Sequence, residues 1–397
     1  MRTLIRGGRI LTPHQTLEHS VLVLENGRIA AIEPEDQVSE FPGEAEVIEA
    51  RGLWVAPGML DLHVHGAVGS DTMDASIEGL RKMSAYFLRQ GVTAYLPTTI
   101  TQTAEAIRRA IDSVIECSRA SEGAQPLGLH LEGPYLGHKN RGAQAPDWLR
   151  NPDPAEYRSW FETGFVRLVT LAPELPGALE LIREGVRAGV RTSAGHTEAG
   201  YSQMRRAAGA GLTQATHTFN GMTGLHHREP GTVGAILTDD RIYAEVIADG
   251  VHLHPAVLGL VFRVKGPERT LLVTDAMRAT GMEDGEYELG GQMMTVRGGV
   301  ARTPTGGLAG STLTMAQALK NAVRFGGAQA GLTLNQALAM ATATPAEALG
   351  LAGRKGSLRP GADADIILLD GDLNLQQALV GGRTAWLAAA MGTAAPL

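Results

Sequence analysis

Six residues with metal-binding or proton-transferring side chains stand at the carboxyl ends of short apolar runs in this sequence. They are His63, His65, Glu132, His196, His217 and Asp275. His63 and His65 are separated by one residue, so on a strand both imidazoles lie on one face and can bind one cation. Together, four histidines and two carboxylates supply nitrogen and oxygen ligands for one or two borderline divalent ions, with zinc and iron(II) the best matches.

Each of these residues, taken singly, has a simpler explanation. An H-x-H pair is often a surface or turn pair, and Glu132 alone could be a buried carboxylate that is paired with an arginine. A lone histidine at a strand end is more often satisfied by hydrogen bonds than bound to a metal. It is the ordered combination around one edge of the predicted fold that favours a metal centre.

The elements that must position these residues begin at Trp54, where short apolar runs start to alternate with helix-length amphipathic stretches. Eight such runs cover residues 59–65, 93–99, 127–133, 165–173, 190–196, 212–218, 242–250 and 270–276. Strand–helix alternation predicts parallel βαβ units. Eight repeats therefore predict an α/β fold with a closed (β/α)8 TIM barrel, whose active site lies at the carboxyl ends of its strands. A doubly wound open sheet is the alternative.

Both ends of the chain differ from this central part. Residues 1–50 alternate apolar and polar positions, with Asn26-Gly27 as a hairpin signal, which predicts a small antiparallel sheet without a helix. The tail returns to strand-like alternation near residues 366–370. We therefore predict a small β-sandwich made from both termini, with residues 1–55 and 350–397 flanking a catalytic barrel of residues 56–349. Two helical stretches, 312–325 and 333–349, follow the eighth strand.

Composition limits the partners of the protein. The 397 residues include 35 Lys and Arg against 42 Asp and Glu, a formal net charge of −7, which disfavours nucleic-acid binding. We find neither a signal-peptide core nor an apolar stretch long enough to span a membrane. The single cysteine, Cys117, fits a reducing compartment. We therefore expect a soluble, cytoplasmic protein that needs a local basic pocket to bind any anion.

The order of these motifs resembles the amidohydrolase superfamily of metal-dependent hydrolases, and within it the deacetylases of amino-sugar 6-phosphates. The H-x-H pair in DLHVHG and the final Asp275 in TDAM match the superfamily. The resemblance to the deacetylases lies in LEGP (131–134), AGHT (194–197), THTFNGM (216–222), REPG (228–231), ADGVH (248–252), LAGS (308–311) and GADAD (361–365). These motifs span nearly the whole chain.

The resemblance implies hydrolysis of the acetamide of N-acetylglucosamine 6-phosphate, which yields glucosamine 6-phosphate and acetate. The galactosamine epimer, or a cyclic-amide hydrolase or deaminase reaction, is the alternative. The resemblance further implies that Glu132, His196 and His217 hold one metal ion. It also implies that His63 and His65 supply a second site, which Glu132 bridges. Because the best-known bacterial relatives lack the H-x-H pair and use one metal, one ion or two per subunit remain open.

Asp275 is the candidate catalytic residue. With the metal ligands in place, it would accept the proton of the attacking water and deliver it to the leaving amine. A further metal ligand is its alternative role, and the two roles are compatible. A catalytically dead relative kept for binding is a different class of hypothesis. It should have lost ligands, whereas every candidate is present in this sequence.

The segment after the sixth predicted strand suits a phosphate group. Residues 220–228 offer backbone N–H groups, imidazoles and a guanidinium, although a solvated loop is the simpler reading. With the resemblance, the expected substrate contacts are Gln144, Asn220, Gly221, His227, Arg228 and His252. Many relatives have histidine where Gln144 stands, and glutamine can donate a hydrogen bond there but cannot titrate. Subunits pair in this family, so we expect a homodimer in which some phosphate contacts reach the neighbouring site.

Overall fold

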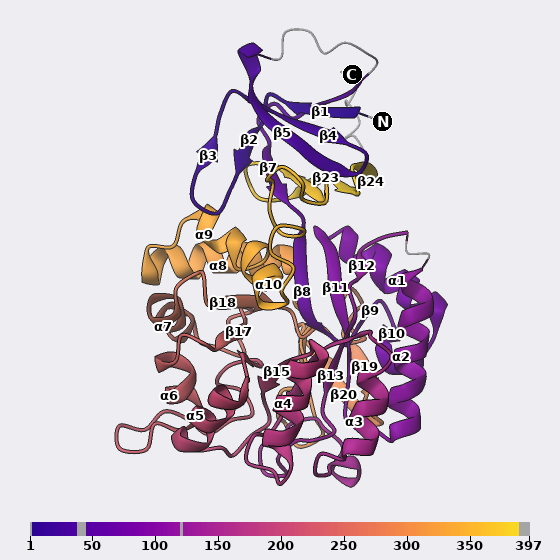
Figure 1. Cartoon of the computed structure of the whole chain (residues 1–397), viewed down its shortest axis with the longest axis vertical. Coiled ribbons are helices and arrows are strands. Elements are labelled where there is room, and N and C mark those ends of the chain that lie inside the picture. The colour runs from indigo at the N-terminus through magenta and orange to yellow at the C-terminus, as the bar shows by residue number, and fades with distance from the viewer. Residues whose placement is uncertain (1, 38–44, 120–121, 389–397) are drawn as a thin grey trace.

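Eight parallel strands follow one another around a barrel in the computed structural model, which describes residues 2–37, 45–119 and 122–388 (Figure 1). Each overlaps one of the eight apolar runs, which confirms the predicted TIM barrel. The strands are β8 (Met59–Val64), β11 (Val92–Thr99), β13 (Leu129–Glu132), β14 (Val166–Leu171), β15 (Arg191–Ala194), β16 (Gln214–Ala215), β17 (Tyr243–Ile247) and β18 (Thr270–Val273). A short β12 (Gln125–Pro126) pairs with the amino end of β11.

Helices follow the strands and cover the barrel from outside. They are α1 (Ile77–Leu88), α2 (Ala104–Ser118), α3 (Pro154–Phe161), α4 (Ala178–Ala188), α5 (Tyr201–Ala210), α6 (Gly231–Thr238), α7 (Pro255–Lys265) and α8 (Met315–Ala330). In α2, Thr103 accepts a hydrogen bond from the Ala106 amide as N-cap, and Ile107, Ile111 and Val114 form one buried face. Cys117 is buried on the same face, so it contributes to the core.

The barrel is closed between its first and last strands by two kinds of contact. At the carboxyl end, the Asp275 amide donates to the carbonyl of His63 at 2.9 Å, and the His65 amide donates to that of Ala276 at 2.8 Å. At the amino end, the Leu60 amide of β8 donates instead to Ala341, in the turn between two later helices. Direct pairing at the carboxyl end therefore sets the H-x-H pair beside Asp275.

A three-stranded antiparallel sheet follows β18 before α8 begins, and the sequence analysis did not predict it. It consists of β19 (Gly285–Leu289), β20 (Gln292–Arg297) and β21 (Val300–Arg302). Gly290-Gly291 and Gly298-Gly299 make its turns with positive φ at all four residues, a conformation that favours glycine. The predicted helix 333–349 is divided in the structure into α9 (Leu334–Ala339) and α10 (Ala343–Ala348).

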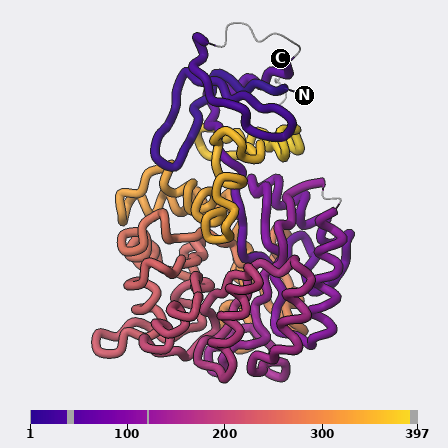
Figure 2. The backbone as a smooth tube through the Cα atoms, in the orientation of Figure 1, coloured from indigo at the N-terminus to yellow at the C-terminus, as the bar shows by residue number. Residues whose placement is uncertain are grey.

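Strands from both ends of the chain form two sheets packed face to face, as predicted. One sheet has the order β5-β4-β1-β6, the other β24-β23-β22-β7-β2-β3. Their bounds are β1 (Arg2–Arg6), β2 (Arg9–Leu11), β3 (Thr16–Leu17), β4 (Ser20–Glu25), β5 (Arg28–Pro34), β6 (Glu46–Glu49), β7 (Trp54–Pro57), β22 (Ile366–Leu369), β23 (Leu375–Val380) and β24 (Arg383–Leu387). Ile5, Leu22, Ile366 and Leu368 share their core. Figure 2 shows the indigo and yellow ends of the chain side by side above the barrel.

Two details of this sandwich differ from the sequence analysis. The first sheet is mixed, because β1 pairs with β6 in parallel, and a 3-10 turn, η1 (Glu35–Gln37), follows β5. Asn26-Gly27 does form the predicted hairpin turn between β4 and β5. The domain boundaries between the sandwich and the barrel, after residues 55 and 349, stay predictions. Residues 38–44 and 389–397 of the two predicted terminal segments lie outside the described residues.

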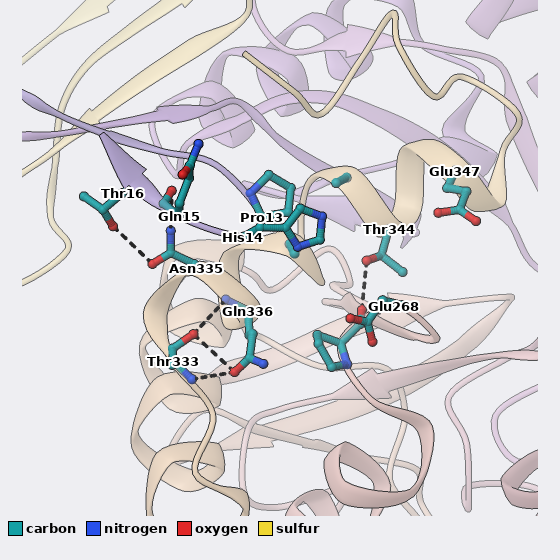
Figure 3. A pocket seen from close by; sticks show the side chains of 13 residues that line it. Pro13, His14, Gln15, Thr16, Glu268, Thr333, Asn335, Gln336, Thr344 and Glu347 are labelled. Atoms are coloured by element: carbon teal, nitrogen blue, oxygen red, sulfur yellow. Dashed lines mark hydrogen bonds between the residues drawn. The ribbon is translucent and has the colours of Figure 1, made fainter. Parts of the chain in front are cut away.

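The sandwich contacts the amino end of the barrel through apolar and polar side chains, and Ile367 and Leu369 of β22 belong to the same core cluster as the barrel strands. The chain passes from β7 of the sandwich into β8 of the barrel, so the carboxyl end of β8 points away from the sandwich (Figure 1). Asn335 of α9 donates to the carbonyls of Thr12 and Gln15 in the β2–β3 turn. Figure 3 shows Asn335 beside Gln15 and Thr16 of this turn. Lys355 contacts Asp365 of the sandwich at 2.5 Å and Gln125 of the barrel at 3.1 Å. In the described part of the chain, no helix combines the length and apolarity required to cross a bilayer.

Lys355→Met should destabilise the protein strongly. The side chains of Lys355 and Asp365 are 5% and 6% exposed, and removing one partner of a buried ion pair typically costs about 3–5 kcal/mol, because the other charge stays buried and unpaired. The measurement is the midpoint of thermal unfolding. Lys82→Met, which removes an exposed ion pair with Glu78, is the control and should leave the midpoint unchanged. Equal midpoints for both variants would contradict this prediction.

Candidate metal centre

All six residues singled out by type and spacing come together at the carboxyl end of the barrel. They form two neighbouring groups of buried side chains, each able to hold a metal ion: Glu132, His196 and His217 in the first, and His63, His65 and Asp275 in the second. The six side chains come from five strands or the residues just after them. The barrel therefore unites residues that lie up to 212 positions apart (275 − 63).

In the first group, three atoms converge on one point. The Nε2 atoms of His196 and His217 lie 3.1 Å from Glu132 Oε1 and 3.1 Å from each other. Both Nδ1–H groups donate to main-chain carbonyls, from His196 to Asn140 at 2.8 Å and from His217 to Asn220 at 3.1 Å. Each Nε2 atom is thereby left with its lone pair, the form that binds a metal.

The second group is arranged in the same way. The Nε2 atoms of His63 and His65 lie 3.3 Å apart, and Asp275 Oδ1 lies 3.4 Å from the first and 3.3 Å from the second. Glu132 connects the groups, because its Oε2 lies 3.2 Å from His65 Nε2 while its Oε1 faces the first group. Glu132 therefore faces both groups, and its role as a bridging metal ligand stays a prediction.

The spacing and charge of these atoms fit bound cations. Ligands around a tetrahedral zinc ion lie ~3.4 Å apart when each bond is 2.0–2.1 Å, close to the separations in both groups. Without a cation, positive charge must come from protonated imidazoles. Burial alone would lower the pKa of His65, but hydrogen bonds and charges from Asp275 and Glu132 raise it to about 9. Burial would likewise raise the pKa of Asp275, yet His63 and His65 lower it to about 2.

Three of the six residues share an unusual backbone conformation. His196, His217 and Asp275 each stand two residues after the last residue of a barrel strand, and their φ angles are 47°, 33° and 50°. A left-handed conformation costs a non-glycine residue about 1–3 kcal/mol and tends to cluster at functional sites. Here it turns the chain at the strand end, so that three side chains point across the barrel opening.

Polar side chains beneath the two groups were missed by the sequence analysis. His130 of β13 donates from Nδ1 to the Leu62 carbonyl at 3.2 Å and accepts at Nε2 from Thr170 at 2.7 Å. Burial, helped by the charge of His63, holds the pKa of His130 well below its usual value, so this imidazole is neutral. The spacing of His130 could have indicated its place in the site, because His130 and Glu132 stand two residues apart on one face of β13.

Asp61 occupies the seam between β8 and β18. Its Oδ2 accepts the hydroxyl of Thr274 at 2.5 Å, and its Oδ1 lies 3.3 Å from the amides of Thr274 and His63. Complete burial raises the pKa of Asp61 to about 7, although these hydrogen bonds oppose the shift. The carboxylate thus ties together the two strands that carry the second group.

A cavity of about 300 Å³ opens over both groups. Four of the predicted substrate contacts line it: Gln144, Asn220, Gly221 and His252. Gln144 donates from Nε2 to Glu132 Oε2 at 2.8 Å, so it also contacts a proposed metal ligand. Apolar lining comes from Ile100, Leu289 and Leu308, two of them from the unpredicted sheet and the loop after it.

His252 is fixed by a carboxylate from its own loop. Asp249 Oδ2 lies 2.7 Å from His252 Nδ1, and Asp249 Oδ1 accepts the amides of Val251 and His252 at 2.8 Å each. Burial would raise the pKa of Asp249, but its hydrogen bond and charge interaction with His252 lower it. The other ring nitrogen of His252 is left available to the cavity that this side chain lines.

The remaining two predicted contacts, His227 and Arg228, do not line this cavity. Both are exposed on the loop between β16 and α6, and the Arg228 guanidinium donates to His227 Nε2 at 2.7 Å. In the described residues, the side chains that line the cavity include four histidines but no lysine or arginine. Within a single chain, therefore, this structure does not bring the predicted phosphate-binding guanidinium to the metal ligands.

A larger cavity, of about 630 Å³, lies at the opposite end of the barrel (Figure 3). It is lined by the β2–β3 turn, α9, α10 and Glu268, and it contains neither of the two metal-ligand groups. The amino ends of barrel strands mainly serve stability, whereas their carboxyl ends carry active sites. We therefore assign the chemistry to the smaller cavity.

Comparison with known proteins finds relatives along nearly the whole chain. Residues 54–389 match the model of the amidohydrolase family. The chain is 42% identical to the N-acetylgalactosamine-6-phosphate deacetylase of Escherichia coli O157:H7, over 97% of this chain and 100% of that protein. It is 41% identical to the N-acetylglucosamine-6-phosphate deacetylase of Vibrio furnissii, over 97% and 95%. The crystal structure of N-acetylglucosamine-6-phosphate deacetylase from Pasteurella multocida superposes with a TM-score of 0.91 at 31% identity, over 97% and 99%.

Proposed function

Because this chain belongs to the amidohydrolase family, we propose that it hydrolyses the acetamide of N-acetylglucosamine 6-phosphate to glucosamine 6-phosphate and acetate. The observation that carries this proposal is the pair of buried ligand groups beneath a cavity that Asp275 also lines. An amide is a poor electrophile with a poor leaving group. Its hydrolysis therefore needs an activated water, a polarised carbonyl and a proton donor for the amine, and this site can supply all three.

We propose two divalent ions per subunit, zinc or iron(II). Glu132, His196 and His217 would hold the first, and His63 and His65, with Glu132 bridging and Asp275 beside them, would hold the second. Bound there, such ions lower the pKa of water toward 7 and polarise the acetamide carbonyl. Support comes from the metal dependence of the family and from the ligand separations, which match a tetrahedral ion.

The residues of this chain would divide the remaining work. Asp275, only 6% exposed and ionised because of the neighbouring imidazoles, accepts the proton of the attacking water and passes it to the departing amine. His252, held by Asp249, presents its free ring nitrogen to the sugar. The Gln144 amide holds the Glu132 carboxylate, and the buried position of the whole group restricts the access of bulk water.

The galactosamine epimer is the second candidate substrate. Relatives named for the two epimers are almost equally similar, at 42% and 41% identity over 97% of this chain. The epimers differ only at the C4 hydroxyl, and a site that hydrogen-bonds one hydroxyl orientation can discriminate strongly against the other. Acetate release from both epimers under identical conditions separates the two functions.

We further propose a cytoplasmic homodimer. The exposed Arg228 and His227 are suited to bind phosphate, yet they stand apart from the cavity of their own chain. Contact with the site of a second subunit would give them that role. The single, buried Cys117 agrees with a reducing compartment.

Asp275→Asn should retain its metal but lose acetate release by about a hundredfold or more, the usual scale for general acid–base catalysis. An amide has nearly the shape of the carboxylate but cannot accept the proton. The measurements are initial rates and elemental analysis of the same sample. Near-normal turnover in a folded, metal-loaded variant would contradict the catalytic role, whereas parallel loss of metal would make Asp275 a ligand.

His63→Gln combined with His65→Asn should remove about one equivalent of metal and leave partial activity. The change deletes two Nε2 ligands of the second group and leaves Glu132, His196 and His217 in place. Elemental analysis after loading with excess zinc checks the stoichiometry. If the metal content equals that of the wild type, the H-x-H pair does not bind an ion.

Arg228→Ala should impair hydrolysis of the phosphorylated sugar far more than that of unphosphorylated N-acetylglucosamine. Loss of a charge-assisted hydrogen bond corresponds to roughly ten- to a hundred-and-fifty-fold in kcat/KM. Arg263→Ala on α7, also an exposed arginine, is the control and should affect neither substrate. A fall by the same factor for both substrates would make Arg228 structural. An absence of any preference in the wild type would favour another amidohydrolase reaction.

A further inference from the structure

His63 differs from the other candidate ligands in what its second ring nitrogen contacts. Its Nε2 faces His65 and Asp275, whereas its Nδ1 points into the barrel and lies 3.4 Å from Glu245 Oε2. The side chains of His63 and Glu245 are both 0% exposed. A carboxylate from β17 thus supports a ligand from β8 across the inside of the barrel.

Glu245 has no evident structural purpose at its position. It stands in β17 among the buried apolar residues Ala244, Val246 and Ile247, where an unpaired carboxylate is costly. Its Oε1 has no hydrogen-bond partner. Among the described residues, its side chain forms an ion pair with His63. Asp61, by contrast, is saturated by Thr274 and by backbone amides. The contact with His63 is therefore what remains to account for this charge.

We propose that Glu245 is a positioning residue that holds His63 in the tautomer and orientation required to bind the second metal ion. Its carboxylate accepts the Nδ1–H of His63, so that Nε2 keeps its lone pair and faces the point shared with His65 and Asp275. A carboxylate behind an imidazole also makes that imidazole a stronger ligand. The inference rests on the proposed two-ion centre and deepens it.

The contact distinguishes the two ion sites. His196 and His217 donate their Nδ1–H groups to the neutral main-chain carbonyls of Asn140 and Asn220. Those supports come from the loops of the rim and do not involve β17. Removal of Glu245 should therefore weaken the second site selectively, whereas loss of a general barrel support would disturb both sites.

The test compares Glu245→Leu, which removes the acceptor, with Glu245→Gln, which keeps an oxygen able to accept from Nδ1–H. Each full-length protein is titrated with zinc, and bound metal is measured by equilibrium dialysis with elemental analysis. We expect two equivalents in the wild type. Glu245→Leu should weaken the second by about 10–100-fold without changing the first, and Glu245→Gln should restore most of the loss.

Gln214→Leu is the matched control. Gln214 is also fully buried on a barrel strand, and its side-chain nitrogen and oxygen both lack partners, so the change has a similar size and apolar character. Because Gln214 belongs to neither ligand group, this variant should keep both equivalents. It separates loss of the contact with His63 from general repacking of the barrel interior.

A second measurement does not depend on the folding of any Glu245 variant. Ring 15N chemical shifts of the zinc-loaded protein, with the His63 signals identified by their loss in His63→Gln, should show a protonated Nδ1. A deprotonated Nδ1 would overturn the proposal.

Full retention of both equivalents in Glu245→Leu would also overturn it, as would equal weakening of both sites. Binding of one ion by the wild type would overturn the two-ion centre together with this inference. Tight binding of two ions by both the wild type and Glu245→Leu would refute the role of Glu245 but leave the two-ion centre intact.

Discussion

A carboxylate buried beside four imidazoles is stable only when positive charge is held next to it. Glu132 is 2% exposed and lies within 3.6 Å of His63, His65, His196 and His217. In an empty site that charge must come from protons on the imidazoles, and in a loaded site it comes from metal ions. Since the carboxylate faces both ligand groups, any shift of β13 would disturb both. The placement of the other ligands follows from this single buried charge.

The fold separates the candidate metal ligands from the apolar side chains that line the cavity. The candidate ligands stand in β8 and β13, one residue after β8, or two residues after β15, β16 and β18, where strand pairing fixes the backbone. The apolar lining of the cavity comes instead from Ile100, Leu289 and Leu308, outside the barrel strands. Insertions there can reshape the cavity at little cost to the ligand geometry, which agrees with the common use of barrels for many substrates.

Sequence reasoning located the barrel, the sandwich from both termini and all six ligand candidates, because each follows from local periodicity and from position at a strand end. It missed Glu245 and Asp61, since their importance depends on partners in other strands, 182 and 213 residues away in sequence. The β19–β21 sheet was missed although two Gly-Gly pairs in an alternating segment could have indicated it. The exposed position of Arg228 was not predictable, because the path of its loop depends on tertiary packing.

The seam between β8 and β18 also sets an order of events during synthesis. The H-x-H strand is made early, but its partners at the seam include Ala276 and Ala341, more than two hundred residues later. At about 5–20 residues per second, one edge of β8 stays unpaired for roughly 15–60 s after it leaves the ribosome. During that time the nascent chain carries an unpaired edge of β8, a strand that is buried throughout in the folded protein, and such an edge can pair with another chain. His63 and His65 meet Asp275 only when the barrel closes, so the second ligand group cannot form before β18 and the residues after it have been made.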